Sequence, residues 1–179
     1  MNLIVAVDQE WGIGRQGKLL FSLKGDMRFF KETTMGHTVV MGRGTLESLP
    51  GARPLKGRRN IVLSHQPAFE VEGAEVCHSF EELFQLLQEG EEVFVMGGAS
   101  LYNGLLPYCE KAYITRVDAS GGADVFITDI SSVPGWEEVA ASEPMCEGEL
   151  SYRFCTWRNR AVRPWPAVAG GESSRSVDG

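Results

Sequence analysis

Apolar residues occur in short runs that alternate with segments of mixed apolar and polar residues. The runs are rich in β-branched and aliphatic residues, and they predict strands at Asn2–Asp8, Thr38–Met41, Asn60–Ser64, Glu92–Met96 and Lys111–Val117. The mixed segments predict helices at Asp26–Thr34, at Gly44–Leu49, from the capping box Ser79-Phe80-Glu81-Glu82 to about Gln88, and from Gly97-Gly98 to Pro107. Strands that alternate with short helices indicate crossover connections and a mainly parallel sheet.

The C-terminal part of the chain has a different pattern. Two strand-like runs, Trp136–Ser142 and Tyr152–Arg158, follow one another with no helix between them, so we expect an antiparallel end to the sheet. From Arg163 onward Pro, Gly and Ser dominate and no periodicity remains, which predicts a disordered tail at 163–179. The preceding residues, 1–162, fit one domain that can bury a sizeable core.

Composition and charge argue against several classes of protein. The 179-residue chain carries a net charge of −7, so it lacks the basic footprint of a nucleic-acid binder. No apolar stretch approaches the roughly 18 residues of a spanning helix, and the N-terminal run is typical of a strand, not of a signal peptide. Four cysteines without a CxxC pair indicate reduced, buried thiols in a cytosol. The chain has only three histidines, which offers few candidate ligands for a zinc site and few candidate bases for a Ser-His-Asp hydrolase.

A glycine motif, G-x-G-x-x-G at Gly12–Gly17, follows the first strand. A dinucleotide-binding fingerprint needs a helix that opens directly at this loop and an acid at the end of the next strand. Here residues 18–25 intervene before the helical pattern, and the next strand ends in Val40-Met41-Gly42-Arg43. These departures disfavour the fingerprint. They leave a flexible surface loop, or a mobile loop beside a site, as the two interpretations.

Asp26 is a candidate catalytic residue at the predicted start of a helix. An acid in this place is often a helix cap or a first-turn residue that the macrodipole favours. However, Leu23, Met27, Phe29 and Phe30 surround it in the sequence. Desolvation by such an apolar wall raises the pKa of a carboxyl group and suits it to proton transfer.

Glycines and cations lie at the predicted carboxyl ends of three strands. Each has a simple structural explanation. Gly42-Arg43-Gly44-Thr45 can be a plain turn, the Asn60–Ser64 strand can end in an ordinary surface histidine at His65, and Gly97–Tyr102 can reflect tight packing of a strand against a helix. Together they favour an anionic ligand at the edge where open α/β sheets bind ligands. The basic loop at 53–60 is either a solvated turn or a carboxylate clamp.

The ordered set of motifs resembles bacterial dihydrofolate reductases, in the same order and at similar spacing over residues 2–160. The motifs are Ile4-Val5-Ala6-Val7-Asp8, Gly12-Ile13-Gly14, Leu23–Lys31, Val40–Thr45, Leu55–Asn60, Val95-Met96-Gly97-Gly98 with Tyr102, and Tyr113-Ile114-Thr115. The resemblance implies an α/β fold, with a mixed, mostly parallel eight-stranded sheet, flanking helices and an antiparallel C-terminal end. It also implies NADPH-dependent reduction of 7,8-dihydrofolate, with hydride delivered to C6 and a proton to N5.

The resemblance also implies roles for individual residues. Asp26 would be the catalytic acid that binds the pterin amino and ring N–H groups, and Arg58 would pair with the glutamate α-carboxylate of the substrate. The substrate contacts expected are Ile4, Ala6, Met27, Phe30, Leu49, Leu55, Arg58 and Thr115. The cofactor contacts expected are Ala6, Ile13, Gly14, Leu19, Gly42, Arg43, Gly44, Thr45, Ser64, His65, Met96, Gly97, Gly98, Ala99, Ser100, Leu101 and Tyr102. No metal site is expected.

Two departures from the family pattern stand out. Leu20-Phe21 replaces a common Pro-Trp pair, which removes an indole donor near the site, and Gly44 stands where a larger residue is common. A riboflavin-pathway reductase of the same fold is one alternative, and it would not need Asp26 or Arg58. A non-catalytic nucleotide-binding domain is another, and it would lack a buried acid. We expect a cytoplasmic monomer.

Overall fold

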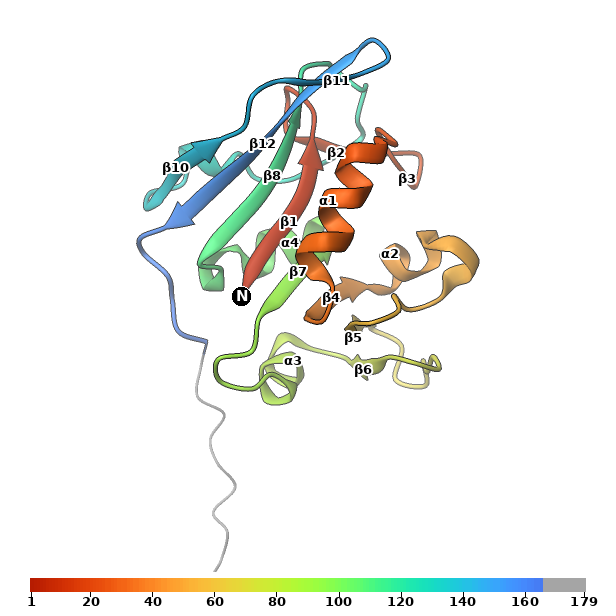
Figure 1. The fold of residues 1–179 in the computed structure, drawn as a ribbon. Helices are drawn as coiled ribbons and strands as arrows, with labels where there is room; N and C mark the ends of the chain where they lie inside the picture. The colour runs from red at the N-terminus through yellow and green to blue at the C-terminus, as the bar shows by residue number, and fades with distance from the viewer. Residues whose placement is uncertain (166–179) are drawn as a thin grey trace, which may run out of the picture.

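The structure is a computed structural model that describes residues 1–165, and most of the predicted tail, 166–179, lies outside the described residues. The main sheet contains β1 (Asn2–Val7), β4 (Thr38–Gly42), β5 (Arg59–Leu63), β6 (Glu75–Cys77), β7 (Val93–Gly97), β8 (Lys111–Val117), β10 (Trp136–Ala141) and β12 (Leu150–Asn159). Their spatial order is β10-β12-β8-β1-β7-β4-β5-β6 (Figure 1). A short strand, β11 (Met145–Glu147), also pairs with β12.

Strand directions confirm the predicted topology. The pairs β1–β7, β1–β8, β4–β7, β4–β5 and β5–β6 are parallel, whereas β12 is antiparallel to both β8 and β10. Residues Thr38–Met41 of β4 are buried without interruption, as expected for a strand of a parallel sheet covered on both faces. The carboxyl ends of β1, β4, β5 and β7 therefore meet along one edge.

Helices cover the two faces of this sheet. They are α1 (Lys24–Thr34), α2 (Arg43–Ser48), α3 (Phe80–Leu86) and α4 (Ala99–Leu105), with 3₁₀ turns η1 (Pro50–Ala52), η2 (Leu106–Tyr108) and η3 (Ile130–Ser132). Side chains from α3 and α4 pack with Val40 and Val95, whereas those from α1 and α2 pack with Val39 and Phe94. Because successive strand residues point to opposite faces, α1 and α2 lie on one side and α3 and α4 on the other.

Helix ends agree closely with the prediction. The Ser79 side chain caps α3 by accepting a hydrogen bond from the Glu82 N–H, as the capping box predicts. The helix ends at Leu86, not at Gln88, because Leu87 is already in an extended conformation. None of the helices among residues 1–165 is long and apolar enough to cross a membrane.

Three expectations need correction. The glycine loop contains two short strands, β2 (Gly12–Arg15) and β3 (Lys18–Leu19), which form a second sheet with β9 (Val125–Phe126) because β9 supplies backbone partners from far along the chain. Cys146 is exposed on the short strand β11, which pairs only with β12, although the other three cysteines are buried. The expected tail at 163–179 begins too early, since the Arg163 N–H donates to the Pro107 carbonyl at 2.9 Å and the Trp165 ring lies 5.5 Å from Phe84.

Candidate active site

Asp26 and Thr115 meet at the carboxyl end of the sheet. Asp26 lies in the first turn of α1, and its Oδ1 accepts a hydrogen bond of 2.6 Å from the Thr115 hydroxyl on β8. Thr115 is buried and stands opposite Ala6 in the β1–β8 register, which brings all three predicted residues together. Burial raises the pKa of Asp26, and the hydrogen bond from Thr115 partly opposes this shift.

An apolar cluster lies next to this carboxylate. Ile4, Phe30, Leu49 and Leu55, which come from four separate segments, pack in it with Met96. The cluster therefore unites most of the predicted substrate wall. Two predicted apolar contacts are not part of this cluster: Ala6, which stands opposite Thr115, and Met27, which is 61% exposed beside Ser22.

Arg58 lies in a groove beyond the far end of α1. Its Nε donates to the Lys56 carbonyl at 3.0 Å and its Nη1 donates to the Thr34 hydroxyl at 3.2 Å, so the guanidinium is held in place. The groove has a volume of about 560 Å³, and Arg53, Leu55 and Lys56 line it as well. Burial lowers the pKa of Arg58, but a guanidinium keeps its charge at neutral pH. Three cations, Arg53, Lys56 and Arg58, and one carboxylate, Glu72, thus line the groove, so that positive charge is in excess there.

The glycine junctions that follow β4 and β7 adjoin each other. A Cβ on Gly42 would lie 3.8 Å from the Gly98 nitrogen, and a Cβ on Gly97 would lie 2.8 Å from the Thr45 hydroxyl. Without side chains at these glycines, a ligand can approach the backbone closely at the edge of the sheet, as in a phosphate cradle. Gly44 faces open space.

Arg43 extends this cradle toward β5. Its Nε pairs with Glu47 at 2.8 Å, its Nη1 donates to Gln66, and its guanidinium lies 4.6 Å from the Phe69 ring centroid. Two expected cofactor residues at the end of β5 differ in environment, since Ser64 is buried and His65 is exposed.

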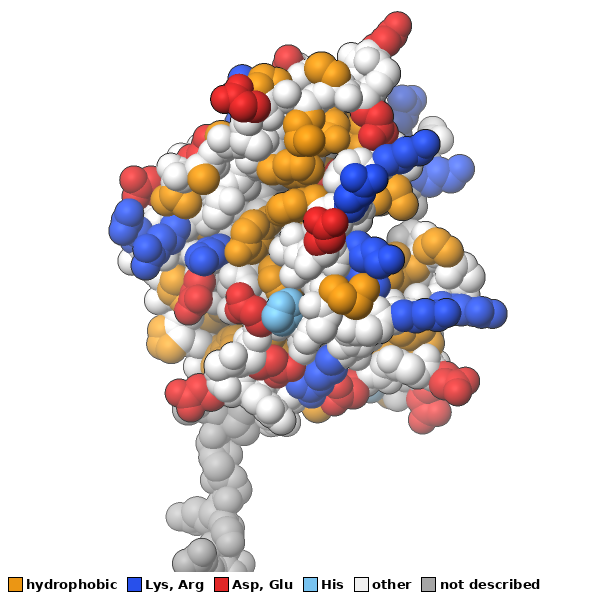
Figure 2. Space-filling model, in the orientation of Figure 1, with side chains coloured by type: hydrophobic (Ala, Val, Ile, Leu, Met, Phe, Trp, Pro, Cys, Tyr) orange, Lys and Arg blue, Asp and Glu red, His pale blue; other side chains and the backbone are white. Residues whose placement is uncertain are grey.

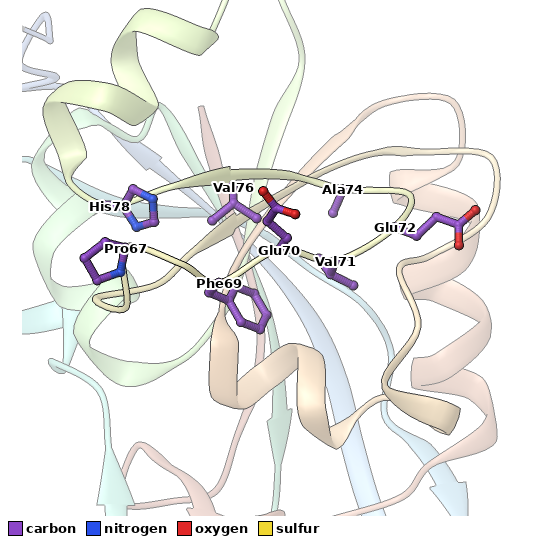
Figure 3. Close-up of a pocket in the computed structure, with 8 residues that line it drawn as sticks. All are labelled: Pro67, Phe69, Glu70, Val71, Glu72, Ala74, Val76 and His78. Carbon is purple, nitrogen blue, oxygen red and sulfur yellow. The ribbon is translucent and has the colours of Figure 1, made fainter.

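His78 joins the same edge of the sheet from the end of β6. Its Nδ1 lies 2.8 Å from the Ser64 carbonyl. His78 and Phe69 also line a groove of about 600 Å³ at the β6 edge (Figure 3). Gln66, Phe69 and His78 were not predicted from the sequence as neighbours of this site. The signal that β6 is a strand was weak, because it has only three residues.

The remaining expected cofactor residues divide into two groups. On α4, Leu101 and Tyr102 are buried, and the Tyr102 hydroxyl donates to the Ile4 carbonyl at 2.8 Å, whereas Ala99 is half-buried and Ser100 is exposed. In the small sheet, Ile13 packs on the core, but the Leu19 side chain is 81% exposed. Gly14 accepts a 3.0 Å hydrogen bond from the Asp124 N–H. The hairpin of β2 and β3 therefore holds Leu19 at the surface.

Within residues 1–165 there is no group of three or more His, Cys, Asp or Glu side chains that could hold a metal ion.

A sequence model of the dihydrofolate reductase family matches residues 1–159. The chain belongs to this family. It is 38% identical over 152 residues to dihydrofolate reductase type 3 of Salmonella typhimurium, a match that covers 85% of this chain and 92% of the relative. It is 48% identical over 119 residues to the dihydrofolate reductase of Mycobacterium tuberculosis, covering 66% of this chain and 71% of that protein.

Solved structures give the same assignment to the family. A dihydrofolate reductase from Enterococcus faecalis, in complex with NADP(H) and the compound RAB-propyl, superposes with a TM-score of 0.78 at 35% identity. The superposition covers 88% of this chain and 95% of that one. This member of the dihydrofolate reductase family therefore has a fold similar to that of the Enterococcus faecalis enzyme over nearly its whole described length.

Proposed function

We propose that the protein catalyses the NADPH-dependent reduction of 7,8-dihydrofolate to 5,6,7,8-tetrahydrofolate. This reaction supplies one-carbon metabolism and thymidylate synthesis. The observation that carries the proposal is the single half-buried carboxylate of Asp26, bonded to Thr115 beside an apolar cluster. That arrangement matches a flat heterocycle with two N–H donors at one edge, because the two oxygens of a carboxylate can each accept a hydrogen bond from such an edge.

The substrate would lie between the carboxylate and the basic groove. Asp26 would accept hydrogen bonds from the pterin amino and ring N–H groups, and Thr115 would keep the carboxylate in position. The apolar residues would enclose the middle of the molecule, and Arg58 would bind the glutamate α-carboxylate. Lys and Arg side chains gather over the side of the molecule that carries α1 and α2, which favours an anionic substrate tail (Figure 2).

The residues at the glycine junctions fit NADPH. A Cβ at Gly97 would fill the space beside Thr45, so this position requires a glycine that leaves backbone N–H groups free for a diphosphate. Arg43 and His65 would bind the 2′-phosphate, and Tyr102 and Ala6 would border the nicotinamide. When bound, the cofactor supplies the hydride that C6 of the pterin receives. The contribution of this chain is to orient the substrate and to favour a proton at N5 through Asp26.

The proposal extends to assembly and location. We expect a monomer in the cytosol with no affinity for nucleic acid, in line with a net charge of −7. Burial raises the pKa of the Cys77 thiol to about 11 and that of Cys109 to about 12, which keeps both thiols protonated and unreactive.

The decisive experiment is NADPH oxidation measured at 340 nm with and without dihydrofolate. We expect oxidation to require dihydrofolate, and 5,6,7,8-tetrahydrofolate to accumulate in equal amount to NADP⁺. Oxidation that instead required an aminopyrimidine of the riboflavin pathway would favour the reductase of that pathway. NADPH binding without turnover of either substrate would indicate a nucleotide-binding domain.

A further inference from the structure

The first turn of α1, which carries Asp26, has no cap of its own. The residue before the helix is Leu23, whose side chain makes no capping hydrogen bond and is buried with Val117 and Tyr152. The first N–H groups of a helix have no partner within the helix, and they need an acceptor from elsewhere. At most helices a Ser, Thr, Asp or Asn directly before the helix supplies it.

Here the acceptor comes from a hairpin more than 120 residues further along the chain. The Glu147 carboxylate accepts hydrogen bonds from the Lys24 N–H, at 2.9 and 3.0 Å to its two oxygens, and from the Gly25 N–H at 3.4 Å. Glu147 is the last residue of β11, opposite Leu150 of β12. A negative charge at a helix N-terminus also interacts favourably with the helix dipole.

The same hairpin fixes the position of α1 at two further points. Gly25 packs so closely on β12 that a Cβ there would lie 2.2 Å from the Tyr152 hydroxyl oxygen. One turn beyond Asp26, the Phe29 ring stacks on Phe154 with ring centroids 4.4 Å apart. Phe154 in turn stands opposite Thr115 in the β8–β12 register. The strand β12 thus contacts both the helix that carries Asp26 and the strand that carries Thr115, and it fixes their positions relative to each other.

We infer that Glu147 is a positioning residue for the reaction, because its hydrogen bonds to Lys24 and Gly25 fix the turn that aims Asp26 at Thr115 and the pterin. This inference rests on the proposed function for its catalytic consequence. The cap itself is a property of the fold and can be measured without turnover. The cofactor cradle is built on β4, β7 and their loops, so loss of the cap leaves it intact.

The test compares three variants. Glu147→Ala removes both acceptors, Glu147→Gln keeps one acceptor without the charge, and Glu149→Ala removes a carboxylate two residues away in the same hairpin. Glu149 is exposed, and its carboxylate forms no hydrogen bond or ion pair with the described residues 1–165. It is therefore a matched control for charge and location.

The measurements are single-turnover hydride transfer, the Kd values of dihydrofolate and NADPH, and amide hydrogen exchange at Lys24 and Gly25. Loss of a helix cap corresponds to about a three- to tenfold change. For Glu147→Ala we expect faster exchange at both amides, with hydride transfer or dihydrofolate affinity reduced by about that factor and an unchanged Kd for NADPH. Glu147→Gln should recover most of the loss, and Glu149→Ala should match the wild type.

Several outcomes would overturn the inference. One is unchanged hydride transfer and dihydrofolate affinity in Glu147→Ala, and another is an equal loss of NADPH affinity, which would indicate a general effect on the fold. Loss in Glu147→Gln as large as in Glu147→Ala would also contradict it. If the wild type did not reduce dihydrofolate at all, the proposed function would fail, while amide exchange would still report whether Glu147 caps the helix.

Discussion

A Cβ atom on Gly97 would lie 2.8 Å from the hydroxyl oxygen of Thr45, and Gly97 has a φ of +142°. Both facts exclude an L side chain, since the contact is too close and the backbone conformation favours glycine. We expect Gly97→Ala to lower the free energy of unfolding by about 1–3 kcal/mol and to weaken NADPH binding. Denaturant unfolding and NADPH titration would measure both effects.

Gly44 provides a matched control for stability. It lies within α2, has no positive φ and has no atom within 4 Å of an added Cβ. Gly44→Ala is therefore expected to stabilise the fold by about 0.5–1 kcal/mol, because alanine loses less backbone entropy in a helix. Equal destabilisation by the two substitutions would show that the environment of Gly97 is not what makes a glycine necessary there.

Arg43 is held in one orientation by Glu47, Gln66 and the face of Phe69, which prepares its guanidinium for a phosphate. We expect Arg43→Ala to raise the KM for NADPH by about 10- to 100-fold, equivalent to about 1.5–3 kcal/mol for a charge-assisted hydrogen bond. The KM for NADH should hardly change, since NADH lacks the 2′-phosphate. Arg160→Ala, which removes an exposed arginine paired with Glu137, is the control. Parallel losses with both cofactors would contradict the assignment.

Arg58 offers a test of substrate recognition. Arg58→Lys keeps the charge but loses the planar pair of donors that binds a carboxylate, and it also loses the geometry that Thr34 and Lys56 support. We expect the KM for dihydrofolate to rise about tenfold, whereas a dihydropterin without the glutamate tail should be reduced as well as before. If both substrates lost affinity equally, the role of Arg58 would be structural.

The central architecture was predictable from local patterns. The continuous apolar run Thr38–Met41 indicates a buried strand of a parallel sheet. The last two strand-like runs have no helix between them, which indicates an antiparallel pair. The small sheet could not be predicted in the same way. Its strand β2 has two glycines, and it pairs with Val125 and Phe126, more than 100 residues away. The local pattern of apolar and polar residues carries no information on a pairing strand so far away in the chain.

The candidate site shows the same division. Asp26 stood out because an acid among apolar residues is unusual, and the fold brings its carboxylate to the Thr115 hydroxyl. Glu147 had no signal in the sequence, since an acid in a short segment near the C-terminus is ordinary, and only the fold of the hairpin places it on α1. Trp165 was assigned to the tail because it stands between two prolines in a segment rich in Pro, Gly and Ser, yet its contact with Phe84 depends on tertiary packing.

Asp26 has a raised pKa because burial disfavours its charged form, although the hydrogen bond from Thr115 acts in the opposite direction. A raised pKa means that the folded protein binds this proton more tightly than the unfolded chain. Stability therefore falls as pH rises from the ordinary Asp value of 3.8 through the folded pKa. Asp26→Asn removes this penalty and its amide oxygen can still accept from Thr115. We expect its melting temperature at neutral pH to equal or exceed that of the wild type.

The same substitution should nonetheless abolish most of the activity at neutral pH. Proton placement by a positioned acid contributes about 10²–10⁴-fold, and an amide cannot favour a proton at N5 in this way. The loss should shrink as pH falls, because dihydrofolate then arrives already protonated from solution. For the wild type, hydride transfer should decline as pH rises through an apparent pKa above 3.8. Pre-steady-state hydride transfer between pH values of about 5 and 9 would measure both profiles. A wild-type rate for Asp26→Asn at neutral pH, in a protein of unchanged stability, would make Asp26 a structural residue of α1 and refute its catalytic role.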